Sequence, residues 1–212
     1  MPVEWIEDLG IKDAESGSEA AHVAREKVLE PARRVLGTTE AYTTMAVVCQ
    51  SFIALAQCLH EAAIQMTEAE NSHAAFTLLR AYAENMAAIL YAKDHPNLAA
   101  NWWDVDGHGI PIGKITNHAQ TLLGGFKGIY DQLSQYDHPQ ARGLLGFSSI
   151  TDWQTVQWSS APHFRSANDR LVAYAWIVEL ADATHLLLYE FAQQYKLGYF
   201  GKPGLDEPPS QS

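Results

Sequence analysis

The sequence predicts an all-α fold, an up-down bundle of four long helices plus a shorter N-terminal helix, with a small β-hairpin before the last helix. Apolar residues recur at helical spacing through long segments, Gly or a His-Pro pair ends most segments, and Ser or Thr stands where several begin. With 212 residues, 47% of them hydrophobic, the chain can bury one core. We expect an N-terminal segment over 1–19, a single helical-bundle domain over 20–198 and a disordered tail over 199–212.

The first two helices are predicted in the N-terminal third of the chain. Residues 20–36 carry valines at helical spacing among basic residues, and Gly37 ends the pattern. Thr38 or Thr39 can cap the second helix, which continues to about Thr67. This second segment has so little charge that we expect it to be a central, nearly buried helix.

Three further helices and a hairpin are predicted after residue 70. A third helix over 72–93 ends before a His-Pro pair, and a fourth over 114–137 ends at another. Residues 143–160 are less helical in pattern and carry a hairpin signal around Thr151 and Asp152. The last helix spans 166–195 and opens with a capping box in which Asp169 takes the place of Glu.

The net charge and the cysteine content limit the classes of protein to which the chain can belong. The 14 Lys and Arg residues against 25 Asp and Glu give a formal net charge of −11, which disfavours sequence-independent binding of nucleic acid. Cys49 and Cys58 fall on opposite sides of one helix and cannot pair there, which fits a reducing compartment. Residues 1–5 show no secretory signal, and polar residues interrupt the apolar run at 41–59. We therefore expect a cytoplasmic protein that does not enter a membrane.

A narrow stripe of ionisable side chains runs along the predicted third helix. His73, Arg80, Glu84 and Tyr91 fall within about 40° of one another on a helical wheel, and the other faces are apolar or small. Two interpretations remain open. The stripe is either the solvent-exposed edge of the helix, with an ordinary surface Arg–Glu pair, or a buried polar network that lines a pocket. In the second case Glu84 must pair with Arg80.

A second candidate pair lies near the end of the predicted fourth helix. Ser134 and His138 stand four residues apart on the face opposite its apolar residues. His138 can act as a general acid or base near neutral pH. Alternatively, it sits at a helix C-terminus, where a cation meets free carbonyl groups. The surrounding sequence lacks a nucleophile elbow, so a hydrolase nucleophile at Ser134 is not expected.

These segments carry a family resemblance. Residues 71–84 contain the pattern Leu-Leu-Arg-x-x-x-Glu, and residues 130–138 fit Tyr-x-x-Leu-Ser-x-x-x-His. Both patterns resemble a group of uncharacterised bacterial helical-bundle proteins, and the similarity covers roughly residues 40–195. The group is loosely similar to HEPN proteins, helical bundles that often act as ribonucleases in toxin–antitoxin and phage-defence systems. A HEPN ribonuclease carries an Arg, four to six further residues and then a His on one helix near its dimer interface.

The chain departs from that signature, because no Arg stands five to seven positions before any of its nine histidines. A ribonuclease would therefore need Arg80 and His138 to meet across the bundle. The resemblance implies a homodimeric module of bacterial stress or phage defence, either a silent one that binds a protein partner or a divergent ribonuclease. Its candidate catalytic residues are Arg80, Glu84, Ser134 and His138.

The alternative is a metal- or small-molecule-binding enzyme that uses His73, Glu84 and His138. Glu70 and His73 form one Glu-x-x-His pair, but di-metal bundles need a second copy and the sequence has none. We therefore expect no metal and no cofactor. The glycines at 124, 125 and 128 are interpreted as points of close approach between helices.

Overall fold

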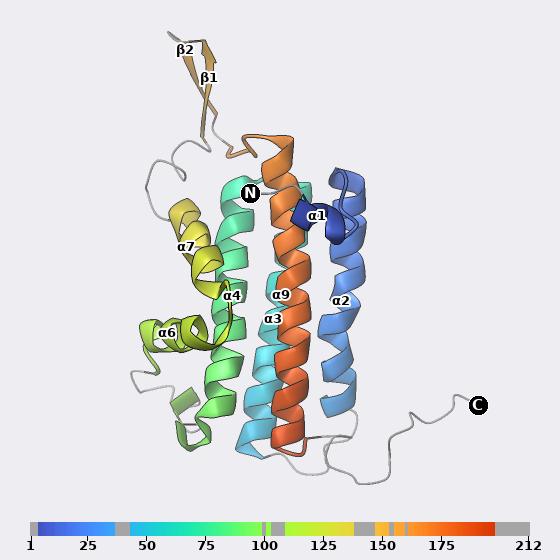
Figure 1. Ribbon diagram of the computed structural model, residues 1–212, viewed down its shortest axis with the longest axis vertical. Coiled ribbons are helices and arrows are strands. Elements are labelled where there is room, and N and C mark those ends of the chain that lie inside the picture. The colour runs from blue at the N-terminus through green and yellow to red at the C-terminus, as the bar shows by residue number, and fades with distance from the viewer. Residues whose placement is uncertain are drawn as a thin grey trace, which may run out of the picture.

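The computed structural model describes residues 4–36, 43–98, 101–102, 109–137, 147–152, 155–159 and 161–197. It confirms an all-α bundle (Figure 1). The tail expected to be disordered, 199–212, lies outside the described residues, and so does His138.

Among the described residues, four long helices form the bundle: α2 (Ala14–Leu36), α3 (Thr44–Glu68), α4 (Ser72–Asp94) and α9 (Ala167–Gln194). In Figure 1, α3 runs opposite to the other three. An ion pair of Arg170 with Glu70 joins the start of α9 to the start of α4, and one of Lys93 with Glu190 joins their far ends. The last helix is therefore parallel to α4, and it packs along both α2 and α4.

Shorter elements flank these four helices. Helix α1 (Glu4–Asp8) covers one end, and a 3-10 turn η1 (Pro96–Leu98) follows α4. Helices α6 (Ile112–Leu122) and α7 (Phe126–Asp137) pack on the outside of α4 and carry the chain back to the end where α9 begins. Because they make the return, α9 can run in the same direction as α4.

A two-stranded ribbon precedes α9, in the segment where the sequence carries a hairpin signal. Strands β1 (Ser148–Asp152) and β2 (Thr155–Trp158) pair antiparallel, with Ser148 opposite Trp158 and Ile150 opposite Val156. In Figure 1 the ribbon projects from the end of the bundle and lies on none of its helices.

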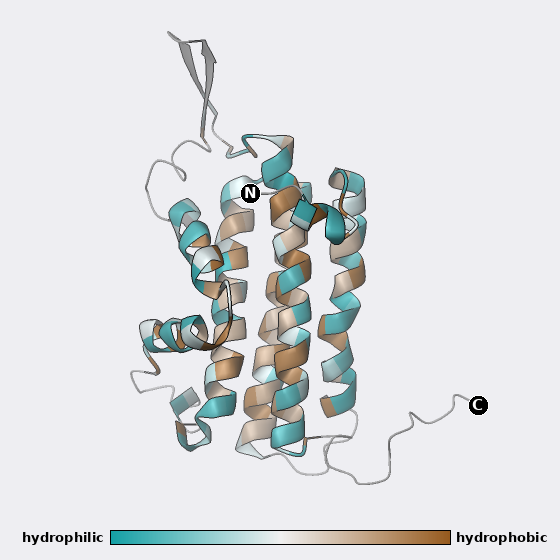
Figure 2. Ribbon diagram, viewed as in Figure 1, coloured by the Kyte–Doolittle hydropathy of each residue, from teal (hydrophilic) through white to brown (hydrophobic). Residues whose placement is uncertain are grey.

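The core lies between the four long helices. Figure 2 shows apolar residues concentrated on their inward sides. Tyr82, Phe76, Tyr174 and Phe191 are among the largest fully buried side chains. Removing an aromatic ring of this kind from water contributes about 2–3 kcal/mol to folding. The bundle therefore depends on contacts between helices that are far apart in the sequence.

The helix predicted over residues 20–36 is α2 in the structure, and it begins at Ala14, six residues before the predicted start. The Ser16 backbone N–H donates to Asp13 Oδ1 at 2.9 Å, and the Asp13 N–H donates to Ser16 Oγ at 3.0 Å. This reciprocal cap satisfies amide groups that a helix start leaves open. Residues 14–19, which the sequence assigns to the N-terminal segment, therefore form the start of α2, and Gly17 lies against Tyr174 of α9.

The predicted helix over 114–137 is also wrong, because the chain turns a corner inside it. Leu123 has an extended backbone (φ −101°, ψ 109°) and Gly125 adopts φ +83°, which favours glycine. A Cβ at Gly124, Gly125 or Gly128 would meet no atom within 4 Å. These glycines therefore do not bring helices together, and the four long helices are not the set that the sequence predicts. The cap of α3 is Thr43, whereas Thr38 or Thr39 was predicted.

Two of the helices that the structure describes are long and apolar enough, by length and composition alone, to cross a membrane. In α3 half of the apolar window is buried inside the bundle, and in α9 the buried share is 67%. Central helices of globular proteins meet the same criterion, so this finding is weak evidence of a membrane segment.

Candidate functional site

The ionisable stripe of α4 faces α6 and α7, and the structure divides it into three separate environments. His73 and Tyr91 are 18 residues apart, which is about 27 Å along a helix that rises 1.5 Å per residue. His73 lies near the start of α4, Arg80 and Glu84 lie in its middle, and Tyr91 lies near its end. The stripe is therefore not one pocket.

The middle environment joins Arg80, Glu84 and Tyr130. Arg80 Nε donates to Glu84 Oε1 at 3.2 Å, and the Tyr130 hydroxyl donates to the same oxygen at 2.7 Å. Arg80 Nη2 lies 3.5 Å from the Tyr130 hydroxyl oxygen. The Arg80 and Glu84 side chains keep 20% and 25% of their surface exposed. The pair is thus neither an open surface pair nor a core pair but a half-buried cluster between α4 and α7.

The Arg80 guanidinium also lies over the Tyr130 ring, with Cζ 5.6 Å from the ring centroid. Such a cation–π contact adds an attraction of about 0.5–1 kcal/mol at a partly exposed site. Burial raises the pKa of Tyr130, and the hydrogen bond to Glu84 raises it further because it favours the protonated phenol. Tyr130 is therefore held as a neutral hydrogen-bond donor.

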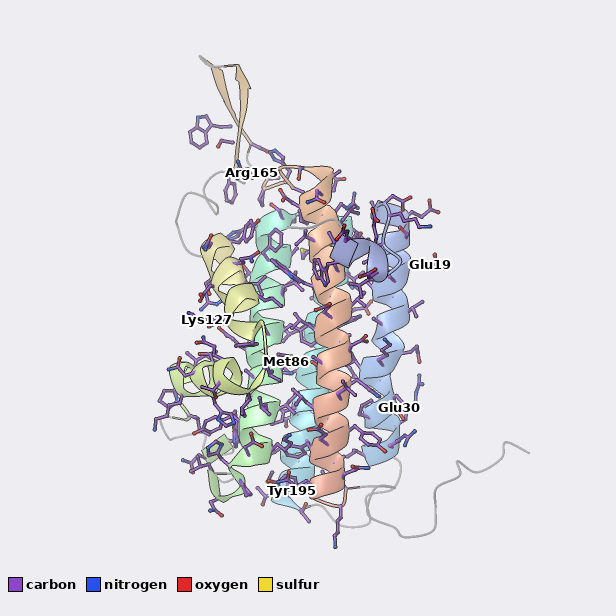
Figure 3. The ribbon with its side chains drawn as sticks, in the orientation of Figure 1. Glu19, Glu30, Met86, Lys127, Arg165 and Tyr195 are labelled. Atoms are coloured by element: carbon purple, nitrogen blue, oxygen red, sulfur yellow. The ribbon has the colours of Figure 1, made fainter. Side chains whose placement is uncertain are left out.

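The apolar residues of α7 fix Tyr130 in this position. Phe126 and Leu133 are buried, and the Phe126 and Tyr130 rings stack with centroids 5.7 Å apart. Tyr136 stacks on Phe76 of α4 at 3.9 Å. Lys127 lies on the outer side of α7 (Figure 3), where it pairs with Asp131 at 3.0 Å and stays away from α4.

The other candidate residues on α7 are only partly placed. Ser134 is half-buried, one turn after Tyr130 on the same side of the helix. His138 lies outside the described residues, so the meeting of Arg80 with His138 stays a prediction. Tyr130 stands in the pattern over 130–138, but sequence reasoning gave it no role, because its contact with α4 depends on how α7 is rotated after the corner.

His73 occupies a different environment at the start of α4. Its ring centroid lies 5.9 Å from that of Phe147. Its Nδ1 is buried and has no hydrogen-bond partner among the described residues. Eleven residues, about 16 Å of helix, separate His73 from Glu84. A single metal ion cannot coordinate both side chains directly, and the predicted alternative site, which also uses His138, stays a prediction.

Tyr91 belongs to an aromatic cluster at the far end of α4. Its ring stacks on His95 at 4.1 Å and meets His118 of α6 edge-on at 5.3 Å. His118 Nε2 lies 2.8 Å from Asp94 Oδ2. Within the ranges that the structure covers, no three His, Cys, Asp or Glu side chains are placed to hold a metal ion. We interpret this cluster as the contact that fastens α6 to α4.

No protein-family model, curated protein or solved structure matches this chain. The resemblance to HEPN proteins therefore depends on the two sequence patterns alone, and the function must be argued from the cluster itself.

Proposed function

We propose that this chain is a HEPN-like helical module of bacterial stress or phage defence that binds a protein partner and does not cleave RNA. The observation that carries the proposal is the engagement of Arg80. A ribonuclease would use this guanidinium to stabilise the developing charge on phosphate. Here its charge is already balanced by Glu84, and its face is covered by the Tyr130 ring.

The electrostatics of the chain support the same proposal. A phosphate that approached Arg80 would also approach the Glu84 carboxylate, because Glu84 Oε1 is hydrogen-bonded to Arg80 Nε. The two negative charges would repel each other. Breaking the pair would leave a half-buried carboxylate without its cation, which is costly. With a net charge of −11, the chain as a whole also repels a polyanion.

The ribbon β1–β2 is the element that we assign to partner binding, and the first partner that we propose is a second copy of the chain. An isolated two-stranded hairpin is marginally stable in water, yet this one projects from the bundle. Trp158, at the end of β2, is 73% exposed. Edge-to-edge pairing of two ribbons about a two-fold axis would form a four-stranded sheet and cover both tryptophans. The homodimer is proposed to act in the cytoplasm.

An RNA-cleavage assay tests the first half of the proposal. Wild type, Arg80→Ala and His138→Ala are incubated with a mixed single- and double-stranded RNA substrate. We expect no cleavage above a buffer control for any of the three. Cleavage by wild type that both variants lose would overturn the silent module in favour of a divergent ribonuclease.

Sedimentation analysis tests the second half. Wild type is expected to sediment as a dimer, and Trp158→Ser as a monomer with unchanged helical circular dichroism. Leu186→Ser is the matched control, because Leu186 is 61% exposed on α9 but lies outside the ribbon. A monomeric wild type, or a dimer that survives Trp158→Ser, would remove the ribbon from the proposal.

A further inference from the structure

A small cleft lies between α7 and α9, at the end of the bundle where α9 begins. Its lining includes Tyr136 from α7 and Trp176 from α9. Both rings contact Phe76 of α4, with centroids 3.9 Å and 5.9 Å from that of Phe76, so α4 supplies the base on which the cleft is built. The volume of the cleft is about 230 Å³, which suits a small metabolite better than a large cofactor.

Two opposite charges line this cleft. Arg165, labelled in Figure 3, directly precedes the cap of α9, and Asp169 lies in the first turn of that helix. Within the described ranges, neither side chain forms an ion pair, whereas the neighbouring Arg170 pairs with Glu70 at 2.8 Å. The cleft therefore presents a positive and a negative group that are not within ion-pair distance of each other.

The polar groups of the cleft are accessible to solvent on both walls. Arg165 and Asn168 are exposed, and Asp169 is half-buried, as is Gln132 on the α7 side. The amides of Gln132 and Asn168 can each donate and accept hydrogen bonds. Trp176, by contrast, is only 2% exposed and limits the depth of the cleft. A ligand that enters the cleft can therefore reach every polar group named here.

These groups determine which ligands fit. An anion at Arg165 would also approach the Asp169 carboxylate, and a cation at Asp169 would approach the Arg165 guanidinium. A ligand without charges would leave both groups without a partner. A small zwitterion satisfies both, because its carboxylate accepts from the guanidinium and its ammonium group donates to the carboxylate. The two amides complement an uncharged polar side chain on such a ligand.

We propose that the α7–α9 cleft binds a free α-amino acid with an uncharged polar side chain. The ligand carboxylate binds Arg165, its ammonium group binds Asp169, and its side chain forms hydrogen bonds with the amides of Gln132 and Asn168. For so small a ligand in a partly open cleft, we expect a dissociation constant of about 1 mM. This site is independent of the proposed function, because it uses neither the cluster around Arg80 nor the ribbon.

L-Glutamine and L-serine represent this class with a long and a short side chain. Their N-acetyl derivatives lack the ammonium group and keep the carboxylate, and their α-amides lack the carboxylate and keep the ammonium group. Binding is followed by NMR titration of the ¹⁵N-labelled full chain. We expect at least one of the two amino acids to shift the side-chain amide resonances of Gln132 and Asn168. Each of its two derivatives should bind at least about fivefold more weakly.

Three variants assign the binding to the two charges. Arg165→Gln should weaken binding of the amino acid at least about fivefold, whereas Arg33→Gln, which removes an exposed arginine from α2, should leave it unchanged. Asp169→Asn should weaken the amino acid but not its N-acetyl derivative, because a general distortion of the cleft would weaken both. All three variants should keep the helical circular dichroism of wild type.

Four results would each overturn the proposal. They are the absence of shifts with both amino acids, equal affinities of an amino acid and its derivatives, binding that survives Arg165→Gln, and equal losses for the amino acid and its N-acetyl derivative in Asp169→Asn.

Discussion

The hydroxyl of Tyr130 donates to Glu84 Oε1 at 2.7 Å, and its removal tests whether the cluster between α4 and α7 stabilises the fold. Tyr130→Phe keeps the ring that stacks on Phe126 and faces Arg80, and deletes only the donor. A hydrogen bond to a charged group contributes about 1.5–3 kcal/mol. Because Glu84 is 25% exposed, water can replace part of the lost bond, so we expect the lower end, about 1.5 kcal/mol.

Urea unfolding followed by circular dichroism measures this loss. With a slope of about 3 kcal/mol per M, a loss of about 1.5 kcal/mol lowers the unfolding midpoint by roughly 0.5 M. Tyr195→Phe is the matched control. Its hydroxyl lies 3.3 Å from the Lys93 carbonyl oxygen, a neutral acceptor at greater distance. We expect a midpoint change less than half as large.

A double-mutant cycle with Glu84→Gln assigns the effect to the pair. If the hydroxyl acts through Glu84, the two substitutions should be non-additive by at least about 0.5 kcal/mol. Additive effects within about 0.3 kcal/mol, or a midpoint for Tyr130→Phe equal to that of wild type, would refute the argument. In that case the cluster would be a surface contact without energetic weight.

Three further predictions use unfolding and thiol-labelling assays. Gly17→Ala should destabilise the protein by about 1–3 kcal/mol, because its Cβ would lie 2.6 Å from an aromatic carbon of α9. Gly128→Ala, with open space around it, should instead stabilise by up to about 1 kcal/mol, and equal effects of the two substitutions would contradict this contrast. Folding raises the pKa of Tyr130, so the contribution of Tyr130 to stability should be complete below about pH 10 and decline as the pH rises above that value. In urea titrations, the free energy of unfolding of Tyr130→Phe should fall less than that of wild type over the same pH range. Ellman's reagent should find one reactive thiol per native chain, Cys58, and two after unfolding, because Cys49 is buried; two fast thiols in the native protein would contradict this.

The sequence predicts the fold where one signal dominates. Long apolar periodicity and the stops near Gly37 and Pro96 are enough to predict the all-α class and the position of α4. The corner at Gly125 was missed, because its flanking residues keep a helical pattern on both sides. The start of α2 was missed for the opposite reason. Asp13 and Ser16 cap each other, but an acidic run with Ser and Gly has the composition of a linker.

The site was predictable only within one helix. An Arg and a Glu four residues apart must be neighbours on a helix, so the pair of Arg80 with Glu84 follows from spacing. Its contact with Tyr130 does not, because that depends on the corner between α6 and α7 and on the rotation of α7 against α4. Whether the stripe is exposed to solvent or buried depends on the same packing of α7 against α4. For this reason the sequence alone left both interpretations open.

The parallel placement of α9 has a consequence for synthesis on the ribosome. The long helices α2, α3 and α4 are made before α9 and can pair with one another, but the core stays open until the residues of α9 that close it, such as Phe191, have been made. Until then the nascent chain presents an apolar trough formed by α2, α3 and α4. Such surfaces attract chaperones and aggregate when release is delayed. The nascent chain therefore needs protection until α9 has been made and has packed against these helices.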